Sequence, residues 1–430
     1  MDPDAFNLRI ESLSYGGRGV GHRQDGKVVF VPMVIPGEIV RVKPVRDHAQ
    51  YIIASALDII EESPNRVKPL CPIFQSCGGC DWQHIQYKEQ VLWKKKILNG
   101  EIEKRCPTGP DKEEDSVESD QIYGYRTHAT IHCSYHPEIS LGFYKKMTKE
   151  VVEFERCPIL NQKIQDTIDS LKTLLGRYPI YNLISLEIHA PQDEVIVLAR
   201  LKDGIHSKDL DTMNTLYKEL DVAGLCFEID GRRTGDYMMG TKYCSYEVMI
   251  QDRVMILSSG LGGFIQANMD VNDLMINHIS ELAAGSDHLL DLYSGSGNIS
   301  IPLSISAKEV VAVDRHVRLI EQGKKNLKRN KIKNVRFITM DAAKAVKSIQ
   351  KESISFDTVV LDPPREGAKE ITGILPSLGA SRIIYVSCNP STLSRDLAGL
   401  MDAGYKLRHT KVFDMFPQTY HIESVSYLER

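Results

Sequence analysis

The chain has 430 residues, of which 42% are hydrophobic and 26% are charged, as in ordinary soluble globular proteins. Its 53 basic and 57 acidic residues leave a formal net charge of −4, which excludes a uniformly basic nucleic-acid-binding protein. No apolar run is long enough to span a bilayer, and the acidic residues 1–4 do not resemble a signal peptide. We therefore expect a cytoplasmic protein whose cysteines are reduced or bind metal.

Residues 1–63 are expected to form a first domain made only of strands. The β-rich runs 27–32 and 38–42 are separated by glycine-rich turns, of which 15–21 is the clearest. Several short strands in so small a segment predict a barrel of the OB type, a shape that often binds nucleic acid. A purely structural β module fits the same pattern.

A second domain of mixed α+β type is expected at residues 64–260. It begins with a compact cysteine loop and continues into a predicted helix at 90–104. The three lysines at 94–96 could contact nucleic acid, but such runs are more often the solvated face of a helix. The mainly acidic stretch 111–120 is interpreted as a solvated surface loop.

The cysteine loop is the candidate metal site of this second domain. Cys71, Cys77 and Cys80 lie close together in sequence, and Cys157 could supply a fourth thiolate. Pairs with Cys-x2-Cys spacing are common zinc ligands, whereas an iron–sulfur cluster also takes four thiolates. The spacing alone leaves both possibilities open.

Residues 261–430 alternate between strands and helices, which predicts a doubly wound α/β sheet. The last two strands follow each other almost directly, which adds an antiparallel element. Ligands of such sheets bind beyond the carboxyl ends of the strands. The predicted strands are 288–292, 309–314, 335–340, 356–361, 382–387, 407–413 and 422–428.

A glycine turn after the first of these strands predicts a nucleoside site. Residues 291–298 contain Gly295 and Gly297, but the third glycine of a dinucleotide fingerprint is replaced by Ser300. Asp314, at the end of the next strand, can accept hydrogen bonds from ribose hydroxyls. A nucleoside without phosphate, S-adenosylmethionine, fits these features; a plain glycine turn beside a surface aspartate is the alternative.

Three polar residues at strand ends indicate covalent chemistry on a pyrimidine. Cys388 ends an apolar run, and a thiolate is a soft nucleophile suited to a polarised carbon–carbon double bond. Asp362 is held by two prolines, and Glu423 lies on the last predicted strand, where we expect His421 to share its face. Amino-methyltransferases use a related turn with an aromatic residue, but Arg365 stands there and Cys388 has no role in amine methylation.

These motifs together resemble the RNA (uracil-5-)-methyltransferase family, including its 23S rRNA branch. The resemblance covers essentially the whole chain, and the first domain looks like the TRAM domain of that family. It rests on Phe264-Ile265-Gln266-Ala267-Asn268, residues 291–298, Asp362-Pro363-Pro364-Arg365, Ser387-Cys388-Asn389-Pro390 and His421-Ile422-Glu423.

The resemblance implies a role for each candidate residue. Cys388 would be the nucleophile at uracil C6, and Glu423 the base that removes the C5 proton. Asp314 stands where glutamate is common in the family, and Asp341 where asparagine also occurs; both can still accept hydrogen bonds. The implied cofactor and uracil contacts are Gln266, Tyr293, Asn298, Asp314, Asp341 and Asp362, and the implied [4Fe–4S] ligands are Cys71, Cys77, Cys80 and Cys157.

The substrate expected from the resemblance is RNA, with no obligate protein partner. A TRAM-like unit together with a cysteine cluster favours 23S rRNA, while tRNA would be served by the same chemical residues. A non-catalytic RNA-binding assembly factor is the alternative from another class. Pure binding would not need Cys388, Glu423 and Asp362 together. Phe264 or Tyr293 could stack on a base, although each could equally be a core residue.

Overall fold

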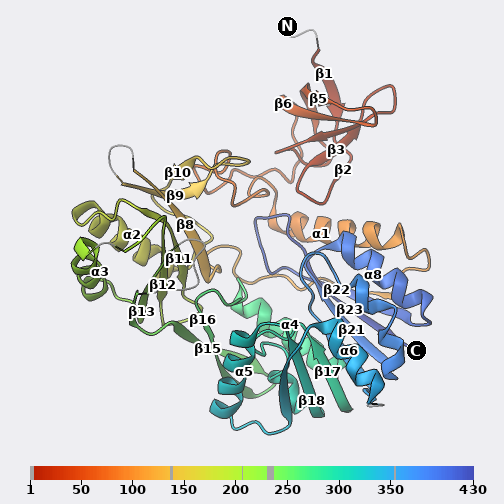
Figure 1. Cartoon of the computed structure of the whole chain (residues 1–430). Coiled ribbons are helices and arrows are strands. Elements are labelled where there is room, and N and C mark those ends of the chain that lie inside the picture. Colours follow the sequence, from red (N-terminus) through yellow and green to blue (C-terminus); the bar gives the residue numbers. More distant parts are fainter. Residues whose placement is uncertain (1–3, 136–138, 206, 230–236, 353–354) are drawn as a thin grey trace.

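The computed structural model describes residues 4–135, 139–205, 207–229, 237–352 and 355–430, which form four sheets. Figure 1 shows the N-terminal strands standing apart at one end of the molecule, above the central and C-terminal parts. In the described residues, no helix has both the length and the apolar character of a membrane span.

The N-terminal unit is a six-stranded sheet in the order β1-β5-β6-β4-β3-β2, which confirms the expected all-β segment. Alternate residues are buried in β4 and in the first part of β5, as in Val29 and Val31 or Val40 and Val42, because successive side chains of a strand point to opposite faces. The likeness to an OB barrel stays an interpretation. Its strands are β1 (Phe6–Arg9), β2 (Ser12–Leu13), β3 (Gly19–His22), β4 (Val28–Val31), β5 (Ile39–Asp47) and β6 (Tyr51–Glu61).

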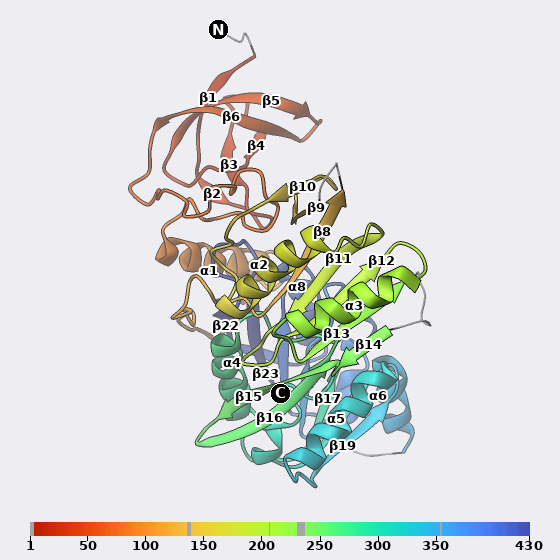
Figure 2. The same cartoon turned by 90° about the vertical axis from the view of Figure 1, so that its left-hand side faces the viewer.

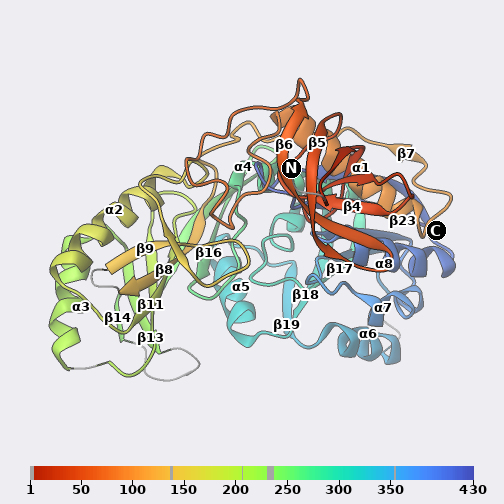
Figure 3. The same cartoon turned by 90° about the horizontal axis from the view of Figure 1, so that it is seen from above.

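The central part is built on a seven-stranded sheet in the order β10-β9-β8-β11-β12-β13-β14. Helices α2 (Gln162–Arg177) and α3 (Ser207–Glu219) lie on its side away from the C-terminal part (Figure 3). The strands are β8 (His128–Tyr135), β9 (Ile139–Tyr144), β10 (Val151–Glu153), β11 (Leu183–His189), β12 (Ile196–Leu201), β13 (Gly224–Ile229) and β14 (Tyr237–Gly240).

The C-terminal sheet has the order β19-β18-β17-β20-β21-β23-β22-β7. Alternate residues of its strands enter two separate cores, Leu290 and Val311 on one face, Leu289 and Val310 on the other, so the sheet is buried on both faces. This arrangement confirms the doubly wound α/β prediction. Its strands are β17 (Ser286–Leu292), β18 (Ala307–Asp314), β19 (Val335–Thr339), β20 (Thr358–Leu361), β21 (Arg382–Ser387), β22 (Lys406–Phe413), β23 (Glu423–Glu429) and the short edge strand β7 (Lys112–Glu113).

Among the strands of this sheet, β23 alone runs antiparallel to its neighbours. It lies between β21 and β22, so the last strand of the chain enters the sheet beside β21. The sheet is accompanied by α4 (Met269–Leu282), α5 (Val317–Arg329), α6 (Ala342–Lys351), α7 (Lys369–Thr372) and α8 (Pro390–Asp402), and by short 3₁₀ turns at Pro302–Ile305 and Leu375–Leu378.

Two segments of the second expected domain pack on the C-terminal sheet. Helix α1 (Tyr87–Glu103) lies beside α8 (Figure 1), and the hairpin of β15 (Tyr243–Ile250) and β16 (Arg253–Gly260) packs against α4 and α5 (Figure 2). The packing therefore crosses the boundary expected at residue 260, and the domain limits stay a prediction.

The interpretation of residues 111–120 as a solvated loop was wrong. β7 pairs in parallel with β22, Val117 forms a bridge with Phe413, and Ser119 is buried. Charged residues obscured this in the sequence, because an edge strand pairs through its backbone and needs no apolar side chains.

The expectation that the lysines at 94–96 lie on a solvated helix face was wrong for Lys94. Its side chain is fully buried, and its Nζ donates to Oδ1 of Asp414 at 2.5 Å and to the carbonyl of Phe416 at 2.9 Å. α1 is covered by the loop that leads into β23, and one lysine of the run 94–96 reaches a carboxylate there.

Replacing Lys94 by methionine is expected to lower the free energy of unfolding by about 3–5 kcal/mol, because it leaves the Asp414 carboxylate buried and unpaired. The exposed Lys96 is the matched control, and its replacement by methionine should cost less than about 1 kcal/mol. Urea unfolding followed by circular dichroism measures both. Equal losses in the two variants would contradict the buried ion pair.

Candidate active site and cysteine pocket

The carboxyl ends of β17, β18, β20 and β21 bring the predicted site residues to one edge of the sheet. Leu292 is paired with both Val313 and Leu361, and Leu361 with Tyr385. The residues that follow these strand ends, including Tyr293, Asp314, Asp362 and Cys388, are therefore neighbours although they are far apart in sequence.

The turn after β17 leaves open space beside its backbone. Tyr293, Gly295 and Gly297 all have positive φ angles, of 66°, 55° and 94°. A Cβ on Gly297 would lie 2.7 Å from Ile301, whereas a Cβ on Gly295 would meet no atom within 4 Å. Gly297 thus allows close packing inside the protein, and Gly295 allows a ligand to approach the backbone closely from outside.

Two of the predicted site's buried acceptor atoms lack hydrogen-bond partners among the described residues. The Oε1 of Gln266 and one carboxylate oxygen of Asp291 are buried and receive no hydrogen bond from the described residues. Burial raises the pKa of Asp291 to about 8, although Ser300 donates to its other oxygen. Unpaired buried acceptors are costly, so Gln266 fits a ligand that brings its own donors, such as the amino acid end of S-adenosylmethionine.

Three further predicted cofactor residues already make contacts within the chain. Asp314 accepts from the backbone N–H of Gly295 at 3.1 Å and from that of His316 at 2.8 Å. The exposed Asp341 caps α6, and Asn298 donates to Asn272 of α4 at 2.8 Å. Oδ1 of Asp314 also lies 2.9 Å from Nδ1 of His316, so of its about four acceptor positions about one remains for a ribose hydroxyl.

Cys388 and Glu423 are placed side by side by the antiparallel ladder between β21 and β23. Ser387 is paired with Ser424, so the next residues outward along the two strands are Cys388 and Glu423. Glu423 is only 6% exposed, while Cys388 is partly exposed. Asp362 is partly buried beside them, and its backbone N–H donates to the carbonyl of Leu292 at 3.3 Å.

The ionisation of these three groups is shaped mainly by burial. Burial raises the pKa of Cys388 to about 11, with further contributions from the Glu423 and Asp362 carboxylates, while Arg365 opposes the shift. Burial raises the pKa of Asp362 to about 7, and burial together with Asp362 holds the pKa of Glu423 well above its usual value. Perturbed groups that converge in this way are typical of reaction centres.

The segment after Cys388 is fixed as the start of a helix. Asn389 caps α8 by accepting from the N–H of Ser391 at 3.1 Å, and Pro390 occupies the first helical position. Asn389 also donates to the carbonyl of Arg365 at 3.0 Å, which ties the nucleophile turn to the Asp-Pro-Pro-Arg turn. The positive end of α8 favours a thiolate at this place.

Tyr15 of the N-terminal unit reaches this site, which the sequence did not predict. Its hydroxyl donates to the carbonyl of Cys388 at 3.1 Å, and its ring meets that of Tyr420 edge-on at 5.6 Å. Two residues later, Gly17 has a φ of 81°, and its carbonyl accepts from Nε1 of Trp82 at 3.3 Å. The sequence marks this turn only by its glycines, and no local pattern indicates where such a turn docks.

Two other expectations are revised or refined by the structure. The prediction that His421 shares a strand face with Glu423 was wrong, because β23 begins at Glu423 and His421 lies in the loop before it, with its ring tilted against that of Tyr420 at a centroid distance of 4.5 Å. Phe264 is 65% exposed, so it is no core residue, whereas Tyr293 is partly buried against the core.

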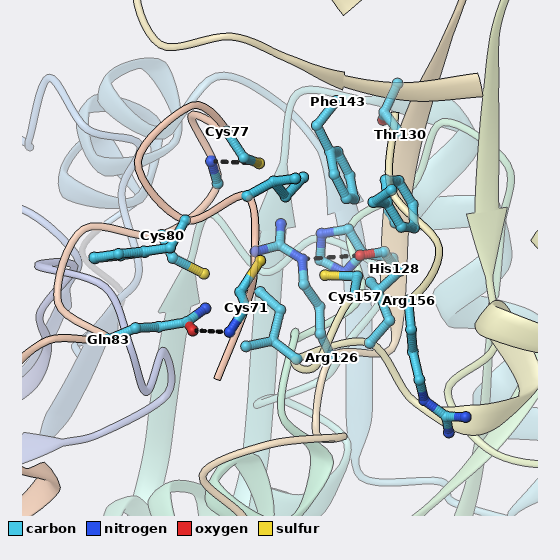
Figure 4. Close-up of a pocket in the computed structure, with 17 residues that line it drawn as sticks. Cys71, Cys77, Cys80, Gln83, Arg126, His128, Thr130, Phe143, Arg156 and Cys157 are labelled. Carbon is cyan, nitrogen blue, oxygen red and sulfur yellow. Dashed lines mark hydrogen bonds between the residues drawn. The ribbon is translucent and has the colours of Figure 1, made fainter. Parts of the chain in front are cut away.

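The four candidate cysteines line one cavity of about 270 Å³ between the cysteine loop and β8 (Figure 4). The backbone N–H of Cys71 donates to Gln83, that of Cys157 to Gln165, and that of Gly79 to the sulfur of Cys77. Apolar side chains form much of the remaining wall, together with Arg126 and Arg156. The apolar lining residues include Ile73, Phe74, Phe143, Phe154 and Leu160.

The spacing of the sulfur atoms bears on the kind of metal. All four cysteines are described, and no three of their sulfurs lie within 4.8 Å of one another. A single tetrahedral zinc with Zn–S bonds of about 2.3 Å needs sulfurs about 3.8 Å apart. An iron–sulfur cluster holds its thiolates farther apart, because each binds a different iron. The donor set and cavity therefore fit a cluster better than one zinc ion.

Comparisons with known proteins identify the class. Residues 87–430 match the family described as tRNA (Uracil-5-)-methyltransferase, and residues 7–65 match the TRAM domain of tRNA (uracil(54)-C(5))-methyltransferase. The chain belongs to the RNA (uracil-5-)-methyltransferase family and is an S-adenosylmethionine-dependent enzyme of RNA modification. The resemblance inferred from the motifs is thereby confirmed at the level of the family.

The individual relatives are named either as 23S rRNA or as tRNA methyltransferases. The chain is 30% identical over 437 residues to the 23S rRNA (uracil(1939)-C(5))-methyltransferase RlmD of Vesicomyosocius okutanii, covering 99% of this chain and 98% of that protein. The protein of the same name from Alcanivorax borkumensis is 32% identical over 436 residues, covering 98% and 96%. The Pyrococcus abyssi tRNA (uracil-54, C5)-methyltransferase, solved with S-adenosyl-L-homocysteine, shares the fold with a TM-score of 0.75 and 22% identity, covering 98% and 100%.

Proposed function

We propose that this enzyme methylates C5 of one uridine in 23S rRNA through a covalent bond between Cys388 and C6. The adjacency of Cys388 and Glu423 at the end of the β21–β23 ladder is the observation that carries the proposal. Full-length relatives at 30–32% identity named as 23S rRNA methyltransferases support the substrate.

The reaction needs a nucleophile because uracil C5 alone is too weakly nucleophilic to accept a methyl group. Cys388 gives up its proton to solvent and its sulfur adds to C6, and the electron pair of the C5–C6 double bond moves toward the C4 carbonyl to make an enolate. Bound S-adenosylmethionine would supply an electrophilic methyl group: C5 forms its new bond to that carbon while the methyl–sulfonium bond breaks and S-adenosylhomocysteine leaves. Asp362, the first residue of the Asp-Pro-Pro-Arg turn, would hydrogen-bond the ring and orient it.

Glu423 completes the cycle. It removes the proton from C5, the C5–C6 double bond reforms, and the C6–S bond breaks to return the Cys388 sulfur. Its raised pKa makes the Glu423 carboxylate a stronger base once it is ionised. The side chain of Phe264 is exposed, so it could stack on a base that is flipped out of the RNA.

The proposed cofactor contacts follow from the turn after β17. Gln266 supplies an unpaired acceptor, Tyr293 opens the turn, and Asp314 has remaining acceptor capacity for a ribose hydroxyl. Asn298 hydrogen-bonds to Asn272 of α4, and Asp341 caps α6, so these two residues hold the helices in place beside the proposed cofactor site.

We further propose that Cys71, Cys77, Cys80 and Cys157 hold a [4Fe–4S] cluster. Methyl transfer requires no redox step, so the cluster organises the cysteine loop against β8. Burial raises the pKa of Cys80 to about 12 and that of Cys157 to about 11, which leaves them as thiols unless a metal ionises them.

Anaerobic purification is expected to give a brown protein with about four irons and four sulfides per chain. Cys80→Ser should lower the iron content by more than half, while Cys133→Ser, outside the cavity lining, should leave it unchanged. Iron and sulfide analysis measures both. One zinc per chain without sulfide would contradict the cluster.

The competing substrate is tRNA, favoured by the fold of the Pyrococcus abyssi enzyme and by the names of the matching families. Purified enzyme with labelled methyl donor should modify 23S rRNA lacking the methyl group, at one uridine found by nuclease mapping. Unmodified tRNA from the same cells serves as the second substrate. Labelling of tRNA alone would reverse the assignment without affecting the chemistry.

A further inference from the structure

Glu114, His278 and His409 form a cluster that the methyl-transfer reaction does not use. Glu114 directly follows β7, His278 lies on α4, and His409 lies within β22. One ligand atom from each lies within 4.8 Å of the other two, and this is the one such group of three found in the described residues. The cluster therefore joins three segments that are remote in sequence.

Two buried imidazole nitrogens in this cluster have no hydrogen-bond partner among the described residues. They are Nε2 of His278 and Nδ1 of His409, and the side chains are only 11% and 14% exposed. Nδ1 of His409 lies 3.5 Å from Oε1 of Glu114. An orphaned polar atom in a buried place is costly, so the pair indicates a ligand that would satisfy both nitrogens.

The surroundings resemble those of a metal site more than those of a core histidine pair. The His409 ring packs against Tyr427 at 5.3 Å, and the His278 ring against Phe413 at 5.6 Å, which shelters the cluster from water.

We propose that Glu114, His278 and His409 bind one zinc ion at this edge of the sheet. Two imidazoles and one carboxylate are a known zinc donor set, and tetrahedral Zn–N and Zn–O bonds of about 2.0–2.2 Å place ligand atoms about 3.3–3.6 Å apart. The observed 3.5 Å between His409 and Glu114 meets this, and the ligand atom of His278 lies within 4.8 Å of both. Nitrogen donors disfavour magnesium and calcium.

The ion would fasten β7 and α4 to β22. α4 begins at Met269, directly after the Gln266–Asn268 segment of the cofactor pocket, and β22 leads into the loop before Glu423. Lys411 competes with the ion, because its Nζ lies 3.2 Å from Oε2 of Glu114 and neutralises that carboxylate. Three protein ligands leave the fourth position of the ion to a water molecule, and the affinity of the site is set partly by Lys411.

Titration of the full-length, anaerobically purified protein with Zn²⁺ and Co²⁺ tests the proposal. Calorimetry should show one equivalent of Zn²⁺ beyond the metal already bound. Co²⁺ at the same site should give visible ligand-field bands without the intense near-ultraviolet thiolate band that cysteine ligands produce. Glu114→Gln and His409→Gln should each weaken binding by about 100-fold, since each removes a direct ligand.

Two further variants separate this site from non-specific binding. Lys411→Met should tighten Zn²⁺ binding by about tenfold, because it removes a competing positive charge. His288→Gln, an exposed histidine paired with Glu309, should change nothing. Glu114→Gln is nearly isosteric, so an unchanged metal-free melting temperature identifies its effect as lost ligation. Failure of wild-type protein to bind an extra ion, or equal binding by wild type and Glu114→Gln, would overturn the proposal.

Discussion

Replacement of Cys388 by alanine is expected to lower methyl transfer on the order of 10⁴-fold or more, because no other group can make C5 nucleophilic. The variant should still bind S-adenosylmethionine within about threefold of wild type, since Cys388 adds to the base and not to the cofactor. Transfer of labelled methyl to RNA and equilibrium dialysis of the cofactor measure the two effects.

The matched control for this variant is Cys133→Ala, which removes a thiol from β8, outside the C-terminal sheet, and should keep full activity. The pH dependence gives a second check. Because burial raises the pKa of Cys388 to about 11, the free enzyme holds a protonated thiol at neutral pH. The reactive thiolate fraction grows as pH increases, so kcat/KM should rise from pH about 6 to about 9. Normal turnover by Cys388→Ala would remove the covalent mechanism.

Replacement of Glu423 by glutamine is expected to trap the reaction after methyl transfer. The amide cannot accept the C5 proton, so the bond between Cys388 and C6 persists and a protein–RNA adduct accumulates, while turnover falls about 10²–10⁴-fold. Denaturing gel electrophoresis with labelled methyl donor should show the label in a band that contains both protein and RNA.

The double variant Cys388→Ala/Glu423→Gln should give no such band, which separates a covalent adduct from tight binding. Glu429→Gln, at the far end of β23, is the matched control and should turn over normally without adduct. A Glu423→Gln variant that releases methylated RNA at the wild-type rate would show that another base acts on C5.

The sequence predicted the C-terminal domain well because its signals are local. Apolar runs such as 382–387 became strands with the expected limits, and polar residues at the strand ends had to meet, since parallel strands share one carboxyl edge. The two glycines of the turn at 295–297 were likewise interpretable, because only glycine adopts such angles without strain.

Contacts between distant segments could not be predicted in the same way. Lys94 looked like its neighbours at 95 and 96, yet a carboxylate more than three hundred residues away covers it. β7 pairs through backbone groups that carry no sequence signal, and the cluster of Glu114, His278 and His409 exists only because β7, α4 and β22 come together. Such features depend on the tertiary arrangement of helices and strands whose own patterns are ordinary.

The hydrogen bond from Tyr15 to the Cys388 carbonyl has a consequence for how small this catalyst can be made. An N-terminal RNA-binding domain is commonly regarded as a separable unit that delivers substrate to an independently active catalytic domain. In this protein, deleting it would also remove the hydrogen bond to the backbone of Cys388, the residue that carries the reactive sulfur. We therefore expect a truncated enzyme without the Tyr15 turn to lose activity even on substrates that need no help in binding.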